Sequence, residues 1–102
     1  MNRGDVFDAD LSVGRHPVVV ITRNATIPIL TSVTVATVTS NARGFVAEVA
    51  IGEAEGLDRD CVVNCNDLST IPKRMLNHHR GTLGPGAMRR LDDALRIALD
   101  LD

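Results

Sequence analysis

The chain has 102 residues, of which 44% are hydrophobic, so it is long enough for one domain with a modest core and too apolar to be disordered. Its net charge is −2, and its only aromatic residues are Phe7 and Phe45, which excludes a protein that stacks nucleic-acid bases on rows of aromatic rings. No apolar stretch is long enough to span a membrane, and Arg3, Asp5 and Asp8 occupy the place of a signal peptide's apolar core. We therefore expect a cytoplasmic protein with no membrane segment.

The first predicted strand covers residues 5–11, where apolar and acidic side chains alternate as in a half-buried strand. Residues 17–22 form a run of mostly β-branched residues, which predicts a second strand covered on both faces. Pro17 has no N–H to donate, so it can only begin this strand or lie at an edge. Arg15 and His16 are therefore expected at the mouth of the second strand.

Further strands are predicted through the middle of the chain. Residues 24–30 contain a proline and predict a loop, and residues 32–39 resume as a strand. Apolar residues then alternate over residues 45–51, which predicts another strand. Residues 61–66 are rich in valine and predict one more, and residues 69–71 predict a short last strand.

A terminal amphipathic helix is predicted at about residues 85–100. Gly84-Pro85 places proline at the first helical position, and apolar residues then recur with the helical period, opposite charged ones. Short strands followed by one helix against the sheet predict a β-rich α+β fold, a small and strongly bent barrel with a C-terminal helix.

The charges are segregated along the chain. Residues 11–47 and 68–90 contain basic residues and no carboxylate. Residues 48–67, between them, carry acids against the single Arg59. If the two basic segments meet in space, they form a cationic groove suited to a polyanion, and the alternative is that these charges are scattered and solvated. All cations except Lys73 are arginine, whose guanidinium matches phosphate oxygens.

The two cysteines are predicted to be buried free thiols. Cys61 and Cys65 point to the same face of a strand but lie too far apart for a direct disulfide. A metal site would need further ligands, and the adjacent His78 and His79 point apart on regular structure. We therefore expect no metal site and no cofactor.

A candidate site follows from pairing two of the predicted strands. If the strand after Pro17 and the strand that ends at Thr39 pair antiparallel, the entrance of one lies beside the exit of the other. Arg15 and His16 then meet Thr39 and Ser40, a set of side chains suited to chemistry on a phosphate. Because Arg15 and His16 alternate in direction on a regular strand, they share the site only if the strand entry is irregular.

Eight short segments are informative together. In chain order they are Arg3-Gly4-Asp5-Val6, Asp10-Leu11, a basic residue before Pro17-Val18-Val19-Val20-Ile21, Val38-Thr39-Ser40-Asn41, Gly56-Leu57, Cys61-Val62-Val63-Asn64-Cys65, Thr70-Ile71 and Leu91-Asp92-Asp93-Ala94-Leu95. In this order and spacing they resemble the MazF/PemK family of ribonuclease toxins. The resemblance implies one toxin domain over residues 1–102, an SH3-like β-barrel, and a homodimer. It also implies metal-independent cleavage of single-stranded RNA, and neutralisation by a cognate antitoxin whose disordered C-terminal tail lies across the same groove.

The resemblance also implies roles for the candidate residues. In the family, the residue before the proline of the second strand is usually arginine, and it acts with the threonine of the Thr-Ser-Asn segment. Here His16 stands at the arginine position, with Arg15 before it, and the threonine is Thr39. We predict that His16 carries a proton and that Arg15 stabilises the phosphorane. Thr39 and Ser40 are predicted to donate hydrogen bonds to the scissile phosphate, although the same residues with Asn41 also suit a plain turn.

The implied reaction is attack of the RNA's own 2′-hydroxyl, which leaves a 2′,3′-cyclic phosphate and a 5′-hydroxyl. Ser40, Asn41, Asn64 and Asn66 are predicted to bind RNA. Some relatives carry an arginine and an aspartate at the positions that Asn64 and Asn66 occupy in this chain. The loop at residues 12–14 is shorter than is usual in the family, so we expect a more open groove.

Two other functions share this fold. One is a toxin that poisons DNA gyrase, but such relatives end in an apolar terminus with tryptophan, whereas this chain ends Leu99-Asp100-Leu101-Asp102. The other is a catalytically degenerate barrel that only binds antitoxin, which the loss of arginine before Pro17 makes conceivable.

Overall fold

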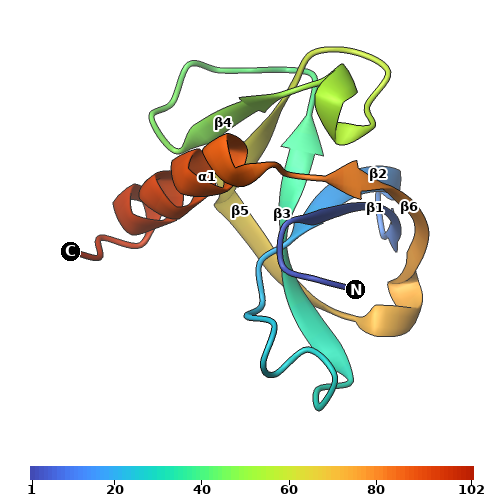
Figure 1. Cartoon of the computed structure of the whole chain (residues 1–102). Coiled ribbons are helices and arrows are strands. Elements are labelled where there is room, and N and C mark those ends of the chain that lie inside the picture. The colour runs from blue at the N-terminus through green and yellow to red at the C-terminus, as the bar shows by residue number, and fades with distance from the viewer.

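The computed structural model describes all 102 residues. The chain folds into one curled, six-stranded antiparallel sheet with a single long helix (Figure 1). Two short 3-10 helices, η1 (Glu53–Glu55) and η2 (Lys73–Met75), connect strands. The main elements are β1 (Asp5–Leu11), β2 (Gly14–Val20), β3 (Ser32–Thr39), β4 (Glu48–Ile51), β5 (Cys61–Pro72), β6 (Leu76–Thr82) and α1 (Pro85–Ala98). The strand order is β4-β5-β3-β2-β1-β6. The predicted β-rich α+β fold, with a bent sheet and a terminal helix, is confirmed.

The central strand β2 is buried on both faces. Val18 and Val20 belong to one apolar cluster, whereas Val19 belongs to a larger cluster that includes Leu91 of α1. Successive side chains of a strand point to opposite faces, so neighbouring valines reach different clusters. The prediction of a strand covered on both faces is confirmed.

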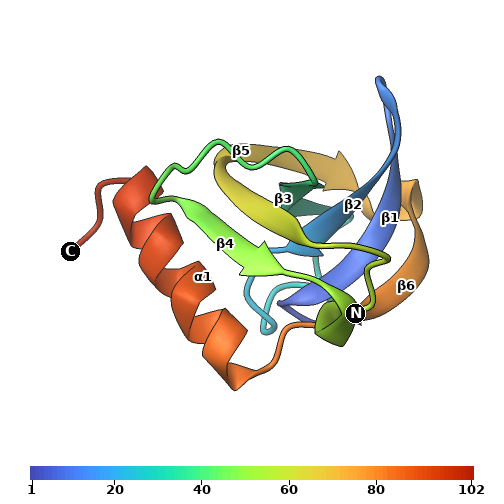
Figure 2. The ribbon, with the colours of Figure 1, turned by 90° about the horizontal axis from the view of Figure 1, so that it is seen from above.

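The start of β2 differs from the prediction. The strand begins at Gly14, so Arg15 and His16 lie within it and not at its mouth. β1 pairs with Gly14–Val19 of β2, but β3 pairs only with Val18–Val20. Pro17 therefore lies where one side of β2 has no partner, and its missing N–H is tolerated as at an edge. Figure 2 shows this end of the β1–β2 hairpin projecting beyond the rest of the sheet.

β5 is one strand of 12 residues, although the sequence predicted two separate strands. Its pairing with β3 shifts register between Asn64 and Leu68. The residues between them, 65–67, form a bulge, and a bulge bends a strand and increases its twist. This bulge curls the sheet and interrupts its ladder beside the end of β3.

β4 is shorter than the predicted strand of residues 45–51 and begins only at Glu48. The backbone N–H groups of Arg43 and Gly44 donate to the Glu48 carboxylate at 3.1 and 2.9 Å. Gly44 also has a φ of 79°, a left-handed conformation that favours glycine. The resulting turn diverts the chain from the sheet and leaves Phe45 exposed.

β6 was not predicted as a strand. Its sequence contains Asn77-His78-His79-Arg80, which has no apolar alternation. β6 is an edge strand that pairs only with β1, and an edge strand does not need two apolar faces. Phe7 of β1 packs against the imidazole of His79, with the two ring centroids 5.1 Å apart.

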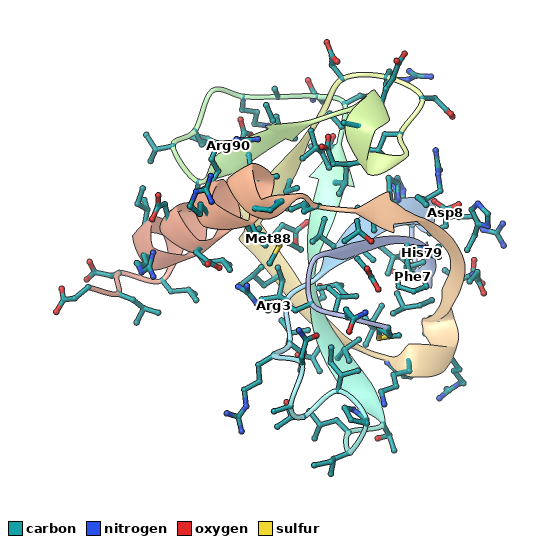
Figure 3. All side chains as sticks on the ribbon, in the orientation of Figure 1. Arg3, Phe7, Asp8, His79, Met88 and Arg90 are labelled. Atoms are coloured by element: carbon teal, nitrogen blue, oxygen red, sulfur yellow. The ribbon has the colours of Figure 1, made fainter.

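The helix α1 confirms the predicted helix at about residues 85–100 and lies against β4 and β5 (Figures 1 and 2). Its buried face includes Leu91, which is fully covered. Arg3 fastens the helix to the sheet, because its Nη2 donates to Asp92 at 2.8 Å and its Nε donates to the carbonyl of Ile21 at 2.9 Å. Figure 3 shows Arg3 and Met88 on the side of α1 that faces the sheet. Neither α1 nor the two 3-10 helices have the length and apolar character of a membrane-spanning helix.

The two edges of the sheet are bridged by the segment that follows β4. This segment, with η1, packs on β6 by backbone contact: a Cβ atom at Gly56 would overlap the carbonyl oxygen of Arg80, and one at Gly81 would overlap the carbonyl of Glu55. Gly56 also has a φ of 88°. Residues 57–59 are thereby held at the mouth of the curled sheet.

Candidate functional site

A groove of about 820 Å³ lies where the beginning of β2 meets the end of β3. Its other walls are the bulge of β5, the loop after β3, and residues 57–59 together with β6. All the predicted site residues except Arg15 line it: His16, Thr39, Ser40, Asn41, Asn64 and Asn66. Residues 12–14 do not line the groove.

His16 and Thr39 come together through the register of two neighbouring strands. β2 and β3 are antiparallel, with Val18 opposite Thr37. The pairing of β2 with β3 ends at Val18, but His16 and Thr39 each lie two residues beyond that last pair, and both line the groove.

Arg15 is not brought to the groove. It lies opposite Asp10 in the β1–β2 hairpin, and its Nε donates to Asp10 Oδ1 at 3.3 Å. A hydrogen bond from Asn77, together with the charge and hydrogen bond of Arg15, lowers the pKa of the Asp10 carboxyl. Because β2 is regular here, the side chains of Arg15 and His16 point to opposite faces. The irregular strand entry that would have placed both in one site is absent.

The hydroxyl of Thr39 is oriented by the loop that follows it. The backbone N–H of Asn41 donates to Thr39 Oγ1 at 3.1 Å, which closes a turn over residues 39–41. The oxygen accepts in this bond, so the hydroxyl proton stays available to a second acceptor. The turn and a role as a donor to phosphate are therefore compatible.

β5 presents two amides to the groove, Asn64 just before the bulge and Asn66 within it. The backbone N–H of Asn66 donates to Asn64 Oδ1 at 3.0 Å. This bond uses the carbonyl end of the Asn64 amide, so its NH₂ end is the part available to a ligand. Asn64 thus offers hydrogen-bond donors at the position where the ladder is interrupted.

The groove is not the uniformly cationic surface that the charge segregation suggested. Arginines from both basic segments do meet there, but the acidic segment between them lines the same groove and offsets their charge. The charged lining residues are Arg43, Arg59, Arg80, Glu48, Asp58 and Asp67. Arg80 was missed by sequence reasoning, since only its place in a basic segment pointed to it.

Residues 2–99 match the model of the family described as PemK-like, MazF-like toxins of type II toxin–antitoxin systems. The chain belongs to this family. It is 38% identical over 87 residues to the endoribonuclease MazF3 of Mycobacterium tuberculosis, covering 85% of this chain and 84% of that protein. The solved structure of the M. tuberculosis toxin MazF-mt6 matches with a TM-score of 0.91 at 36% identity, covering 96% of this chain and 98% of that one.

A second solved structure extends the likeness to a complex. The endoribonuclease in complex with its cognate antitoxin from Mycobacterial species matches this MazF-like toxin with a TM-score of 0.92 at 28% identity. The match covers 100% of this chain and 97% of that one. The relatives of this toxin are thus endoribonucleases, and one of them is seen bound to an antitoxin.

The two thiols of this MazF-like toxin differ in environment. Both cysteines are free; Cys61 lines the groove, whereas Cys65 is only 1% exposed. Burial disfavours the thiolate and raises the pKa of Cys65 from 9.0 to about 11. The Cys65 thiol is therefore a neutral core group and takes no part in chemistry at the groove.

The raised pKa predicts a loss of stability at alkaline pH. At pH 8 and below, the thiol is almost fully protonated in both the folded and the unfolded chain, so it contributes little pH dependence. Between pH 9 and 11 only the unfolded chain releases the proton, and we expect Cys65 to lower the free energy of unfolding by about 2 kcal/mol at about pH 10.5. Urea unfolding at pH 8 and at about pH 10.5 measures the loss. Cys65→Ala should remove it, whereas Cys61→Ala should retain it; an equal loss in Cys65→Ala would contradict the assignment.

Proposed function

We propose that this protein is an endoribonuclease that cleaves single-stranded RNA in the groove without a metal ion. The observation that carries the proposal is that His16 of β2 and Thr39 of the neighbouring strand β3 line one polar groove. The endoribonuclease relatives, which match most of the chain, support the same activity.

The proposed step needs a proton carrier. When the RNA's 2′-oxygen attacks the adjacent phosphorus, the new P–O2′ bond forms and the P–O5′ bond breaks. A proton must leave the 2′-hydroxyl, and one must reach the departing 5′-oxygen. His16 is the groove residue suited to carry protons, because imidazole both accepts and donates them near neutral pH. The products are a 2′,3′-cyclic phosphate and a 5′-hydroxyl.

Hydrogen-bond donors complete the proposed site. The Thr39 hydroxyl and Ser40 donate to the scissile phosphate, whose negative charge grows in the transition state. Asn41, Asn64 and Asn66 bind the flanking RNA, and the free NH₂ group of Asn64 favours a base with an acceptor at that position.

The Thr39 assignment predicts a large effect from a small change. Thr39→Val keeps the shape of the side chain but removes the donor, and we expect the cleavage rate to fall about 10²–10³-fold. Thr39→Ser keeps the hydroxyl and should stay within about tenfold of the unmodified protein. Single-turnover cleavage of a labelled RNA measures both rates, with circular dichroism as the folding control. Wild-type activity in Thr39→Val would show that the hydroxyl only closes a turn.

We further propose that the protein acts as a homodimer and is neutralised by a cognate antitoxin with a disordered C-terminal tail that lies in the groove. The antitoxin complex of a relative supports the second partner. Apolar side chains that the single chain leaves exposed, among them Ile29, Phe45 and Ile97, are available for these contacts.

One set of incubations separates the proposed function from its alternatives. The protein is mixed with a defined single-stranded RNA in EDTA, with the same sequence as DNA, and with gyrase and relaxed plasmid. Cleavage of the RNA but not the DNA supports the ribonuclease, because only RNA carries the attacking 2′-hydroxyl. Inhibited supercoiling would support the gyrase poison, and the absence of both effects would support the non-catalytic barrel.

A further inference from the structure

Arg80 of β6 enters the groove with its guanidinium already oriented. Its Nε donates to the carbonyl oxygen of Gly56, and its Nη1 donates to Asp8 Oδ1, each at 3.1 Å. Asp8 lies on β1, which pairs with β6 (Figure 3), and its side chain is 14% exposed. These two contacts already restrict the side chain, so little further ordering is needed to bind a third partner.

The remaining nitrogen, Nη2, has a much weaker partner. It lies 3.6 Å from Asp58 Oδ1, which is too long for a hydrogen bond, and the Asp58 side chain is 89% exposed. Ion pairs with so exposed a partner contribute little, because solvent screens the charges. Asp58 is therefore a displaceable partner, held near Nη2 by charge alone.

We propose that Arg80 binds a phosphate of the RNA through Nη2, and that Asp58 competes with that phosphate for the same nitrogen. Arg80 and Asp58 both line the groove that contains His16 and Thr39. Phosphate and carboxylate oxygens accept the same hydrogen bond from a guanidinium, so one replaces the other without rearrangement of Arg80. The inference rests on the proposed RNA cleavage and adds the positive charge that Arg15, paired with Asp10 outside the groove, does not supply.

The competition makes Asp58 a residue that weakens RNA binding. Asp8 offsets the charge of Arg80 from the buried side, and Asp58 then adds a negative charge at the open side. An incoming phosphate must displace this carboxylate from Nη2, and because both groups are negatively charged, their repulsion opposes binding. Removing the charge of Asp58 should therefore strengthen binding, and it should do so only through Arg80.

The test measures binding of a labelled, uncleavable 2′-O-methyl RNA by fluorescence anisotropy at about 50 mM and about 200 mM salt. We expect Asp58→Asn to bind about three- to tenfold more tightly at the lower salt, and to steepen the log–log salt dependence by up to about 0.7, because a carboxylate no longer offsets the contact between Arg80 and the phosphate. Asp93→Asn is the matched control: Asp93 is 73% exposed, pairs with Arg96 on α1, and lies outside the groove lining. Asp93→Asn makes the same charge change and should leave the RNA affinity and its salt dependence nearly unaltered.

A second variant shows whether the gain passes through Arg80. Arg80→Gln should weaken binding about five- to tenfold and abolish the gain from Asp58→Asn when the two are combined. If Arg80→Gln does not fold, the comparison of Asp58→Asn with Asp93→Asn still decides the proposal. Binding by Asp58→Asn no tighter than by Asp93→Asn, or a gain that persists without Arg80, would overturn it.

Cleavage of unmodified RNA by the same set of proteins tests the proposed function separately from the role of Arg80. Cleavage of the matching unmodified RNA by the wild-type protein, without any gain in Asp58→Asn, would overturn the Arg80 assignment alone. A gain in Asp58→Asn with no cleavage of RNA would leave Arg80 as a phosphate-binding residue and overturn the ribonuclease.

Discussion

Replacing His16 with alanine is expected to lower the rate of RNA cleavage by about 10²–10⁴-fold, the usual contribution of a positioned acid or base. His16 lines the groove together with Thr39 of the neighbouring strand β3. Its side chain is part of neither apolar cluster, so its loss should leave the fold intact. Single-turnover cleavage with circular dichroism as the folding control measures the effect.

The neighbouring arginine provides the matched comparison. Arg15 is one residue away on the same strand, but it is exposed, pairs with Asp10 and does not line the groove. We expect Arg15→Ala to stay within about threefold of wild-type activity, since an exposed pair contributes little. A large loss in Arg15→Ala with normal activity in His16→Ala would reverse the assignment.

Replacing Gly56 with alanine is expected to destabilise the protein by roughly 2–5 kcal/mol, the sum of a left-handed backbone penalty and a steric clash. Gly56 has a φ of 88°, and a Cβ atom there would overlap the carbonyl oxygen of Arg80. The obstacle is the backbone of β6, which cannot rotate away as a side chain could. Urea unfolding measures the free energy, and cleavage should also fall because residues 57–59 form a wall of the groove.

Gly44 separates the two causes of this loss. Its φ of 79° is also left-handed, but nothing lies within 4 Å of a Cβ atom placed there. Gly44→Ala should therefore cost only the backbone penalty, about 1–2 kcal/mol. Equal losses in the two variants would show that the packing of the Gly56 segment on β6 is unimportant.

The elements predicted correctly are those whose local pattern matches their surroundings. The valines of β2 are buried on both faces and form an unbroken apolar run, and α1 has one apolar face and a proline at its start. β6 was not predicted because an edge strand can be polar. The start of β4 was predicted too early because the Glu48 carboxylate closes a turn with residues earlier in the chain. These outcomes depend on contacts that no local pattern encodes.

The residues of the candidate site also include some that the sequence predicted correctly and some that it did not. His16 and Thr39 line the same groove because they lie on two neighbouring antiparallel strands, both of which the sequence identified. Arg15 fell outside the groove because the strand entry is regular, which only the pairing of β1 with β2 determines. Arg80 reaches the groove because β6 lies beside β1 and is bridged to the Gly56 segment, an arrangement set by the topology of the whole sheet.

The most direct test of the central claim is the chemistry of the ends that cleavage leaves. Wild-type protein is incubated with a defined single-stranded RNA in EDTA, and the products are identified by mass spectrometry. Attack by the 2′-hydroxyl in the His16–Thr39 groove predicts a 2′,3′-cyclic phosphate on one product and a 5′-hydroxyl on the other. Products with a 3′-hydroxyl and a 5′-phosphate, or intact RNA, would contradict it.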